Sequence, residues 1–146
     1  MPYLLLQVVH LLCAMAFAGV VFVEVLLLPG VRRRLPARVA LPWEHAFGRR
    51  ARRLMPWIVL ALYLSGAGLA WHHRGALAQP WSSGFGTLLA VKLALAASVA
   101  LHVVAALWLQ RRGRLTGARS DWIHRSVLAH VLSIAVIAKA MFHLVF

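Results

Sequence analysis

Four long apolar segments constrain the fold of this chain more than any other feature. They cover residues 3–28, 54–71, 85–109 and 126–146. At 1.5 Å per helical residue, each is long enough to cross the roughly 30 Å hydrocarbon core of a bilayer. Hydrophobic residues make up 62% of the sequence, against about 45–50% in soluble domains. We therefore predict an all-α fold, an integral membrane four-helix up-and-down bundle that forms a single domain over residues 1–146.

The net charge of +13 is concentrated in two of the three segments that connect these helices. Residues 29–53 contain eight arginines and one glutamate, residues 110–125 contain five arginines and one aspartate, and residues 72–84 contain only Arg74. The positive-inside rule places both basic segments in the cytoplasm of a bacterium. The N- and C-termini then lie on the periplasmic side of the inner (cytoplasmic) membrane. Because topology accounts for the charge, the expected partner is the lipid bilayer, and no nucleic acid.

Prolines and glycines predict where the helices begin and end. Pro29-Gly30 is expected to end the first helix, and Pro56 to lie in the first turn of the second. Between them, residues 43–47 form either an amphipathic segment along the inner membrane face or a solvated loop. The first segment is interpreted as a retained helix, because it lacks the basic start of a signal peptide. No internal repeat is apparent.

Several classes of chemistry are excluded by composition. The chain has three acidic residues, no Ser/His/Asp arrangement and no phosphate-binding glycine loop, which argues against hydrolysis. The single Cys13 excludes an internal disulfide, and the absence of a CxxCH motif excludes covalent haem attachment.

Six histidines and lysines interrupt the apolar segments: His10, Lys92, His102, His130, Lys139 and His143. Depth in the membrane follows from the distance of each residue to the centre of its segment. His10 and His143 then share a level in the outer half, with the two lysines just below them. His102 and His130 share a level in the inner half. Buried charges are expensive in hydrocarbon, so such residues usually mark a function.

Histidines on facing helices can ligate a haem iron from both sides, and lysines can pair with haem propionates. We therefore expect haem b as cofactor, with the four histidines as candidate iron ligands and the two lysines as further cofactor-binding residues. His130 and His143 are thirteen residues apart, about 220° around a helix, so one haem is expected rather than two. The alternative is structural: His130 bonds a neighbouring helix, His143 marks the interface, and Lys92 snorkels or pairs with Glu24.

Four short stretches carry a resemblance to a known family. The sequence contains YLLLQVVH at residues 3–10, RRLMP at 52–56, KLAL at 92–95 followed by His102, and AKAMF at 138–142. In this order and spacing they resemble the HemJ-type protoporphyrinogen oxidases and their CopD-like relatives. The resemblance implies an inner-membrane protein that binds b-type haem, with His10 and Lys92 at the family's functional positions. Two departures are SVLAH at 126–130, where the family has Asn-Glu-x-Pro, and Leu101 in place of an aromatic residue.

The leading hypothesis is a b-haem membrane protein of this group, acting in electron transfer or porphyrinogen oxidation. It would be an oxidoreductase with quinone or a porphyrinogen as partner. The first alternative is a copper-handling membrane protein, for which the signal is the adjacent pair His72-His73. The second is a non-catalytic accessory subunit of a respiratory membrane complex, and a homodimer or larger membrane complex is compatible with each hypothesis.

Overall fold

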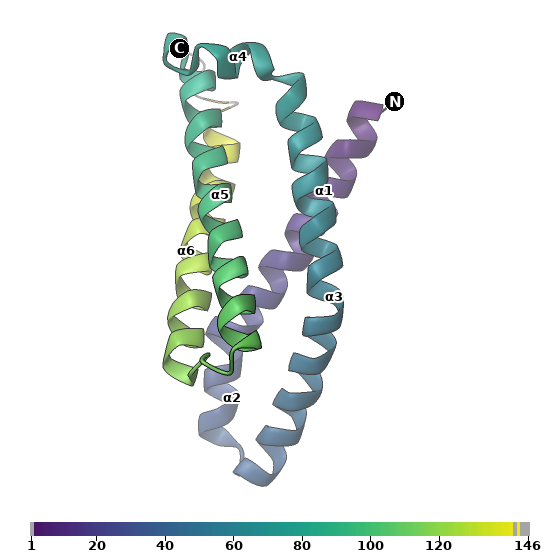
Figure 1. The fold of residues 1–146 in the computed structure, drawn as a ribbon, viewed down its shortest axis with the longest axis vertical. Helices are drawn as coiled ribbons and strands as arrows, with labels where there is room; N and C mark the ends of the chain where they lie inside the picture. Colours follow the sequence, from purple (N-terminus) through teal and green to yellow (C-terminus); the bar gives the residue numbers. More distant parts are fainter. Residues whose placement is uncertain (1, 142, 144–146) are drawn as a thin grey trace. The chain divides into compact units, whose positions relative to one another are not determined.

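The computed structural model describes residues 2–141 and 143, and no β-strand occurs among them (Figure 1). The elements, in chain order, are α1 (Pro2–Phe22), the π-helical segment η1 (Val23–Leu27), α2 (Leu28–Arg34), α3 (Ala37–His72), α4 (Arg74–Ala78), the 3₁₀ turn η2 (Pro80–Ser82), α5 (Gly84–Arg111) and α6 (Gly117–Ala140).

Four helices are long and apolar enough to cross a membrane: Pro2–Arg34, Ala37–His72, Gly84–Arg111 and Gly117–Ala140. The predicted all-α, four-helix membrane fold is therefore confirmed, and the chain is a multi-pass membrane protein. The apolar faces of these helices suit contact with a lipid bilayer.

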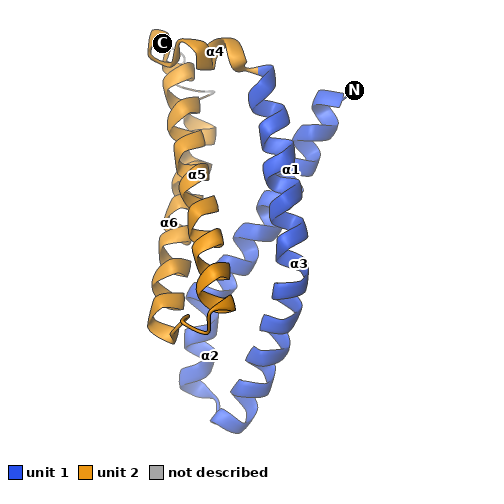
Figure 2. Cartoon of the chain, viewed as in Figure 1, with its two compact units in different colours: residues 1–72 blue, residues 73–146 orange. Residues whose placement is uncertain are grey.

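The chain divides into two compact units, residues 1–72 and 73–146 (Figure 2). In the first unit, α1 packs against α3, and the two helices run antiparallel. In the second unit, α5 packs antiparallel to α6, and α4 and η2 contact the start of α5. Each unit is thus a helical hairpin, and the single domain predicted over residues 1–146 remains a prediction.

The prediction that Pro29-Gly30 ends the first helix is wrong, because the helix continues to Arg34. Directly before the proline, the Leu28 N–H donates to the carbonyl of Val23, a bond of π-helical spacing. A proline in a regular α-helix lacks a donor and clashes with the carbonyl four residues earlier. The wider π turn shifts these carbonyls, so the chain passes Pro29 and remains helical.

The predicted connection over residues 29–53 is also wrong in its length. Only residues 35 and 36 separate α2 from α3, and both Pro42 and Pro56 lie inside α3. Arginine is a good helix former, so a basic segment next to a membrane extends a helix as readily as it forms a loop. Across the short turn, Arg32 Nε donates to Glu44 Oε1 at 2.6 Å. Trp43 and Phe47 stack one helical turn apart, with ring centroids 5.8 Å apart.

The fourth helix begins earlier than predicted, at Gly117, because the side chain of Thr116 caps it by accepting a bond from the Arg119 N–H. The predicted continuation over residues 142 and 144–146 lies outside the described residues.

Candidate functional site

The expectation that the chain has no internal repeat is wrong, because a repeated stretch builds the contact between α5 and α6. SVALHVV at residues 98–104 of α5 matches SVLAHVL at residues 126–132 of α6 in its serine, first valine, histidine and second valine. The valine after each serine, Val99 or Val127, is 4% exposed. Because the helices are antiparallel, each serine lies beside the histidine of the other copy.

The two serines and two histidines form a closed ring of four hydrogen bonds. Ser126 Oγ lies 3.0 Å from His102 Nε2, and Ser98 Oγ lies 3.0 Å from His130 Nε2. Within each helix, His102 Nδ1 donates to the Ser98 carbonyl at 2.7 Å, and His130 Nδ1 donates to the Ser126 carbonyl at 2.8 Å. Every polar side-chain atom of the four residues thus has a partner, as a polar group in a membrane requires.

These bonds fix the tautomer of both imidazoles. A carbonyl oxygen can only accept, so Nδ1 carries the proton and Nε2 is the acceptor that receives the serine hydroxyl. Histidines that ligate metals are commonly held in this way, with one ring N–H on a backbone carbonyl and the other nitrogen as donor to the metal. Both rings therefore have a form suited to ligation at Nε2.

His102 and His130, which were predicted to share a level, lie close together across the contact of α5 and α6. Their ring centroids are 5.4 Å apart, with an angle of 53° between the planes. The ring of His102 also stacks on Trp122, at 5.9 Å and 28°. The structural alternative for His130 was a hydrogen bond to a neighbouring helix, and His130 makes such a bond to Ser98 of α5.

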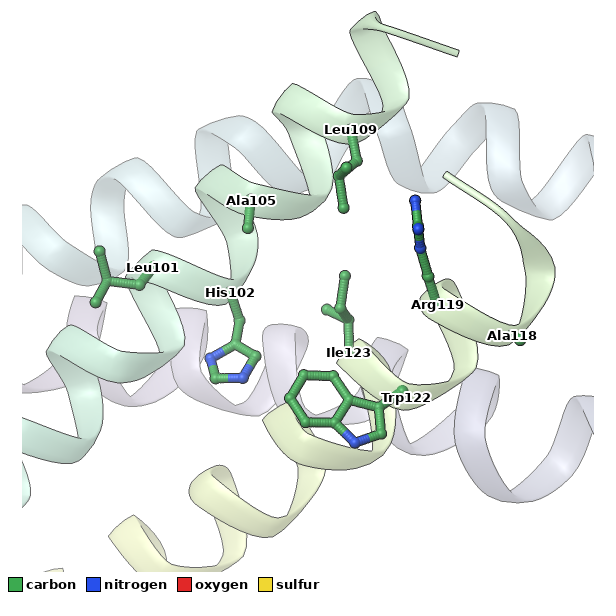
Figure 3. A pocket seen from close by; sticks show the side chains of 8 residues that line it. All are labelled: Leu101, His102, Ala105, Leu109, Ala118, Arg119, Trp122 and Ile123. Atoms are coloured by element: carbon green, nitrogen blue, oxygen red, sulfur yellow. The ribbon is translucent and has the colours of Figure 1, made fainter. Parts of the chain in front are cut away.

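An open apolar groove of about 530 Å³ adjoins His102 (Figure 3). Its lining residues are Leu101, His102, Ala105, Leu109, Ala118, Arg119, Trp122 and Ile123. His102 and Arg119 lie on opposite sides of Ile123 in Figure 3, and their side chains are the only ones of this lining set that can carry a charge. Arg119 also donates to the carbonyl of Arg114 at 3.1 Å. The lining of the groove is thus almost entirely apolar, and the side chains of His102 and Arg119 border it.

In the first unit, His10 of α1 contacts α3. Its Nδ1 lies 3.1 Å from the Leu62 carbonyl and 3.3 Å from Ser65 Oγ, while Ser65 Oγ donates to the Ala61 carbonyl at 2.6 Å. Nδ1 therefore carries the proton, as in the other two histidines. A Cβ at Gly66 would lie 3.0 Å from His10 Cε1, so the ring can approach α3 only at a glycine.

The structure brings the remaining predicted site residues neither into the hydrogen-bond ring of His102 and His130 nor into the contact of His10 with α3. Lys92 is half-buried in α5, and Lys139 and His143 are exposed, with His143 Nδ1 donating to the Lys139 carbonyl at 3.2 Å. His10 lies in the first unit and His143 in the second, so their pairing stays a prediction.

Two features bear on a metal site. Within the described residues, no three His, Cys, Asp or Glu side chains converge as a chelating site would require, whereas haem needs only one or two axial histidines. The adjacent His72 and His73 contact different rings, those of Tyr3 at 5.0 Å and Phe85 at 5.3 Å.

Sequence reasoning missed Ser98, Ser126, Trp122 and Arg119. The signal for the serines was the repeated SVxxHV pattern, which places a hydroxyl four residues before each histidine. No comparable signal points to Trp122 and Arg119, which have the residue types of an ordinary membrane boundary. Comparison of the chain with protein-family models, with curated proteins and with solved structures finds no match.

Proposed function

We propose that this protein binds haem b in the groove between α5 and α6 and acts as a membrane oxidoreductase. The observation that carries the proposal is an apolar groove of about 530 Å³ that has His102 in its wall and Arg119 on its far side. Ligand sites typically measure about 300–1,000 Å³ and combine apolar walls with a few polar groups. The groove has such a volume and apolar walls, with His102 and Arg119 at its border.

The side chains fit the chemistry of a haem. His102 has its Nδ1 proton on the Ser98 carbonyl at 2.7 Å, which leaves Nε2 as the basic nitrogen for iron. The guanidinium of Arg119 is suited to a propionate, because it can bond a carboxylate with two parallel N–H groups. The face of Trp122 extends the apolar wall beside the imidazole. When bound, a haem of this type supplies one-electron transfer between ferric and ferrous iron.

The other predicted residues keep proposed roles of different kinds. His10, His130 and His143 are candidates for a second axial ligand, and Lys92 and Lys139 for contacts to propionates. His10 and Lys92 also correspond to functional positions in the HemJ-type and CopD-like group, to which we assign the chain by resemblance. Electron transfer with a quinone, or oxidation of a porphyrinogen, is the activity this assignment implies. The proposed location is a bacterial inner membrane, with both termini in the periplasm.

An optical spectrum of the purified protein tests the proposal. Oxidised and dithionite-reduced samples are compared, and a pyridine haemochrome counts haem per chain. We expect a Soret band with sharp reduced α and β bands and about one haem per chain. Of the four single His→Ala variants, H102A should abolish the low-spin bands. H10A, H130A and H143A each test one candidate for the second axial ligand, and variants at histidines that do not bind the iron should keep these bands.

The contrary results are equally clear. A protein that stays colourless after haem supplementation refutes the haem proposal, and metal analysis of the same sample then distinguishes copper handling from an accessory role. A coloured protein in which H102A keeps its low-spin bands refutes the location of the site in this groove.

A further inference from the structure

The ring of hydrogen bonds between α5 and α6 blocks the nitrogen that the proposed function needs. His102 Nδ1 is occupied by the Ser98 carbonyl at 2.7 Å, and Nε2 by the Ser126 hydroxyl at 3.0 Å. A neutral imidazole has a single acceptor nitrogen. Any group that coordinates or donates to His102 must therefore first displace Ser126.

Ser126 can be displaced without leaving a buried donor unpaired. A serine in a helix can donate to the carbonyl four residues earlier, which for Ser126 belongs to Trp122. Two serines of this protein make that bond already: Ser65 Oγ donates to Ala61 at 2.6 Å, and Ser133 Oγ donates to Ala129 at 2.9 Å. A rotation of the Ser126 hydroxyl thus exchanges one acceptor for another.

The two copies of the repeat differ in what they adjoin. His102 lines the groove, whereas His130, Ser98 and Ser126 are not among its lining residues. The hydrogen bonds of the two histidines are otherwise matched, at 3.0 Å to the serine hydroxyl and 2.7 or 2.8 Å to the carbonyl. The bond between His102 and Ser126 therefore joins the helices next to a ligand-sized space, whereas the bond between His130 and Ser98 joins them away from the groove.

We infer that the Ser126 hydroxyl is a reversible cap on His102 Nε2 and sets the affinity of the groove for ligands of this imidazole. Ser126 is thus a positioning residue that competes with the ligand. Its effect on haem rests on the function proposed above, but the cap itself does not. The matched serine of the other copy, Ser98, caps His130, which does not line the groove.

The ligand arm of the test is a haemin titration of the full-length protein in detergent. Interhelical hydrogen bonds in membranes contribute about 0.6 to 1.7 kcal/mol, which corresponds to about a 3- to 20-fold change in affinity. Ser126→Ala should tighten haemin binding by this factor, because the competitor is gone. Ser98→Ala removes an equivalent bond and should change affinity less than about twofold, and Ser126→Thr, which keeps the hydroxyl, should resemble the wild type. Weaker or unchanged binding by Ser126→Ala overturns the inference.

The ligand-free arm is ¹⁵N NMR of protein labelled at its histidines. In Ser126→Ala, the Nε2 resonance of His102 should move downfield, toward that of an imidazole nitrogen without a hydrogen bond, while that of His130 stays in place. Ser98→Ala should reverse this pattern. If neither variant moves its resonance, the cap does not exist. If the resonances move as expected and no variant binds haemin, the cap is supported and the haem proposal fails.

Discussion

The approach of His10 to α3 depends on Gly66, and Gly66→Ala measures that dependence. A Cβ at this position would lie 3.0 Å from His10 Cε1 and 3.3 Å from Nδ1. Carbon atoms in contact prefer about 3.5–4.0 Å, so the ring or the helix must give by a few tenths of an ångström. The imidazole cannot move freely, because Nδ1 is already held at 3.1 Å from the Leu62 carbonyl and 3.3 Å from Ser65 Oγ.

The expected loss of stability follows from three contributions. Overpacking costs about 1–3 kcal/mol, and loss of the hydrogen bond of His10 costs about 1 kcal/mol. Replacing glycine by alanine within a helix stabilises the helix by about 1 kcal/mol. Gly66→Ala should therefore lower the free energy of unfolding by about 1–3 kcal/mol, mainly because His10 must give up its position.

Two other glycines of the first unit provide controls. A Cβ at Gly19 of α1 would meet no atom within 4 Å in the described part of the chain, so Gly19→Ala should be neutral or stabilising by up to about 1 kcal/mol. A Cβ at Gly68 would lie 3.0 Å from Leu6 Cδ1, the end of a flexible side chain that can rotate away. Gly68→Ala should therefore fall between the other two variants.

Unfolding in mixed micelles with increasing dodecyl sulfate, followed by the fluorescence of the six tryptophans, gives the three free energies. Each variant is compared with and without His10→Ala, which removes the clashing ring. The penalty of Gly66→Ala should shrink in that background. Equal stability of the Gly66 and Gly19 variants, or a Gly66 penalty that His10→Ala leaves unchanged, would refute the proposed packing of His10.

Three further predictions concern topology, the turn between α2 and α3, and a helix cap. In a variant without the native cysteine, Gly75→Cys should react with a membrane-impermeant maleimide in spheroplasts and Ala46→Cys only after lysis; the reverse pattern contradicts the positive-inside assignment. Glu44→Gln removes the ion pair with Arg32, in which the Glu44 side chain is 11% exposed and the Arg32 side chain 55%. The free energy of unfolding should fall by at most about 1 kcal/mol, and amide hydrogen exchange in the turn should become faster. A much larger loss of global stability would assign the ion pair a larger role. Ser83→Ala removes the hydroxyl oxygen that accepts a hydrogen bond from the Gly86 N–H of α5 at 3.1 Å. The free energy of unfolding should fall by about 1 kcal/mol, which lowers the melting temperature. Ser83→Asp can still cap the helix and should show no such loss.

The number and class of the helices could be predicted from the sequence because they depend on composition alone. A run of about twenty apolar residues satisfies its backbone in a membrane only as a helix, whatever its neighbours are. The helix ends were less predictable. Pro29 stops an α-helix in isolation, but a π turn before it lets the chain continue, and the need for such a turn is not encoded in a residue type.

The shared level of His102 and His130 could be predicted from the sequence, but their hydrogen bonds could not. Depth counting placed His102 and His130 at one level, because the rise per residue is fixed and the helices are antiparallel. The hydrogen-bond partner of each imidazole could not be predicted from depth, because the partner depends on how each helix is rotated about its own axis.

The sequence by itself thus determined an all-α membrane protein with four long helices and a level-matched pair of histidines. Only the tertiary structure decided that Ser98 and Ser126 close a ring with these histidines, and that His102 alone of the pair borders a groove. The physical reason is that hydrogen bonds between helices need distances near 3 Å, and only the register and rotation of two packed helices set distances to that accuracy.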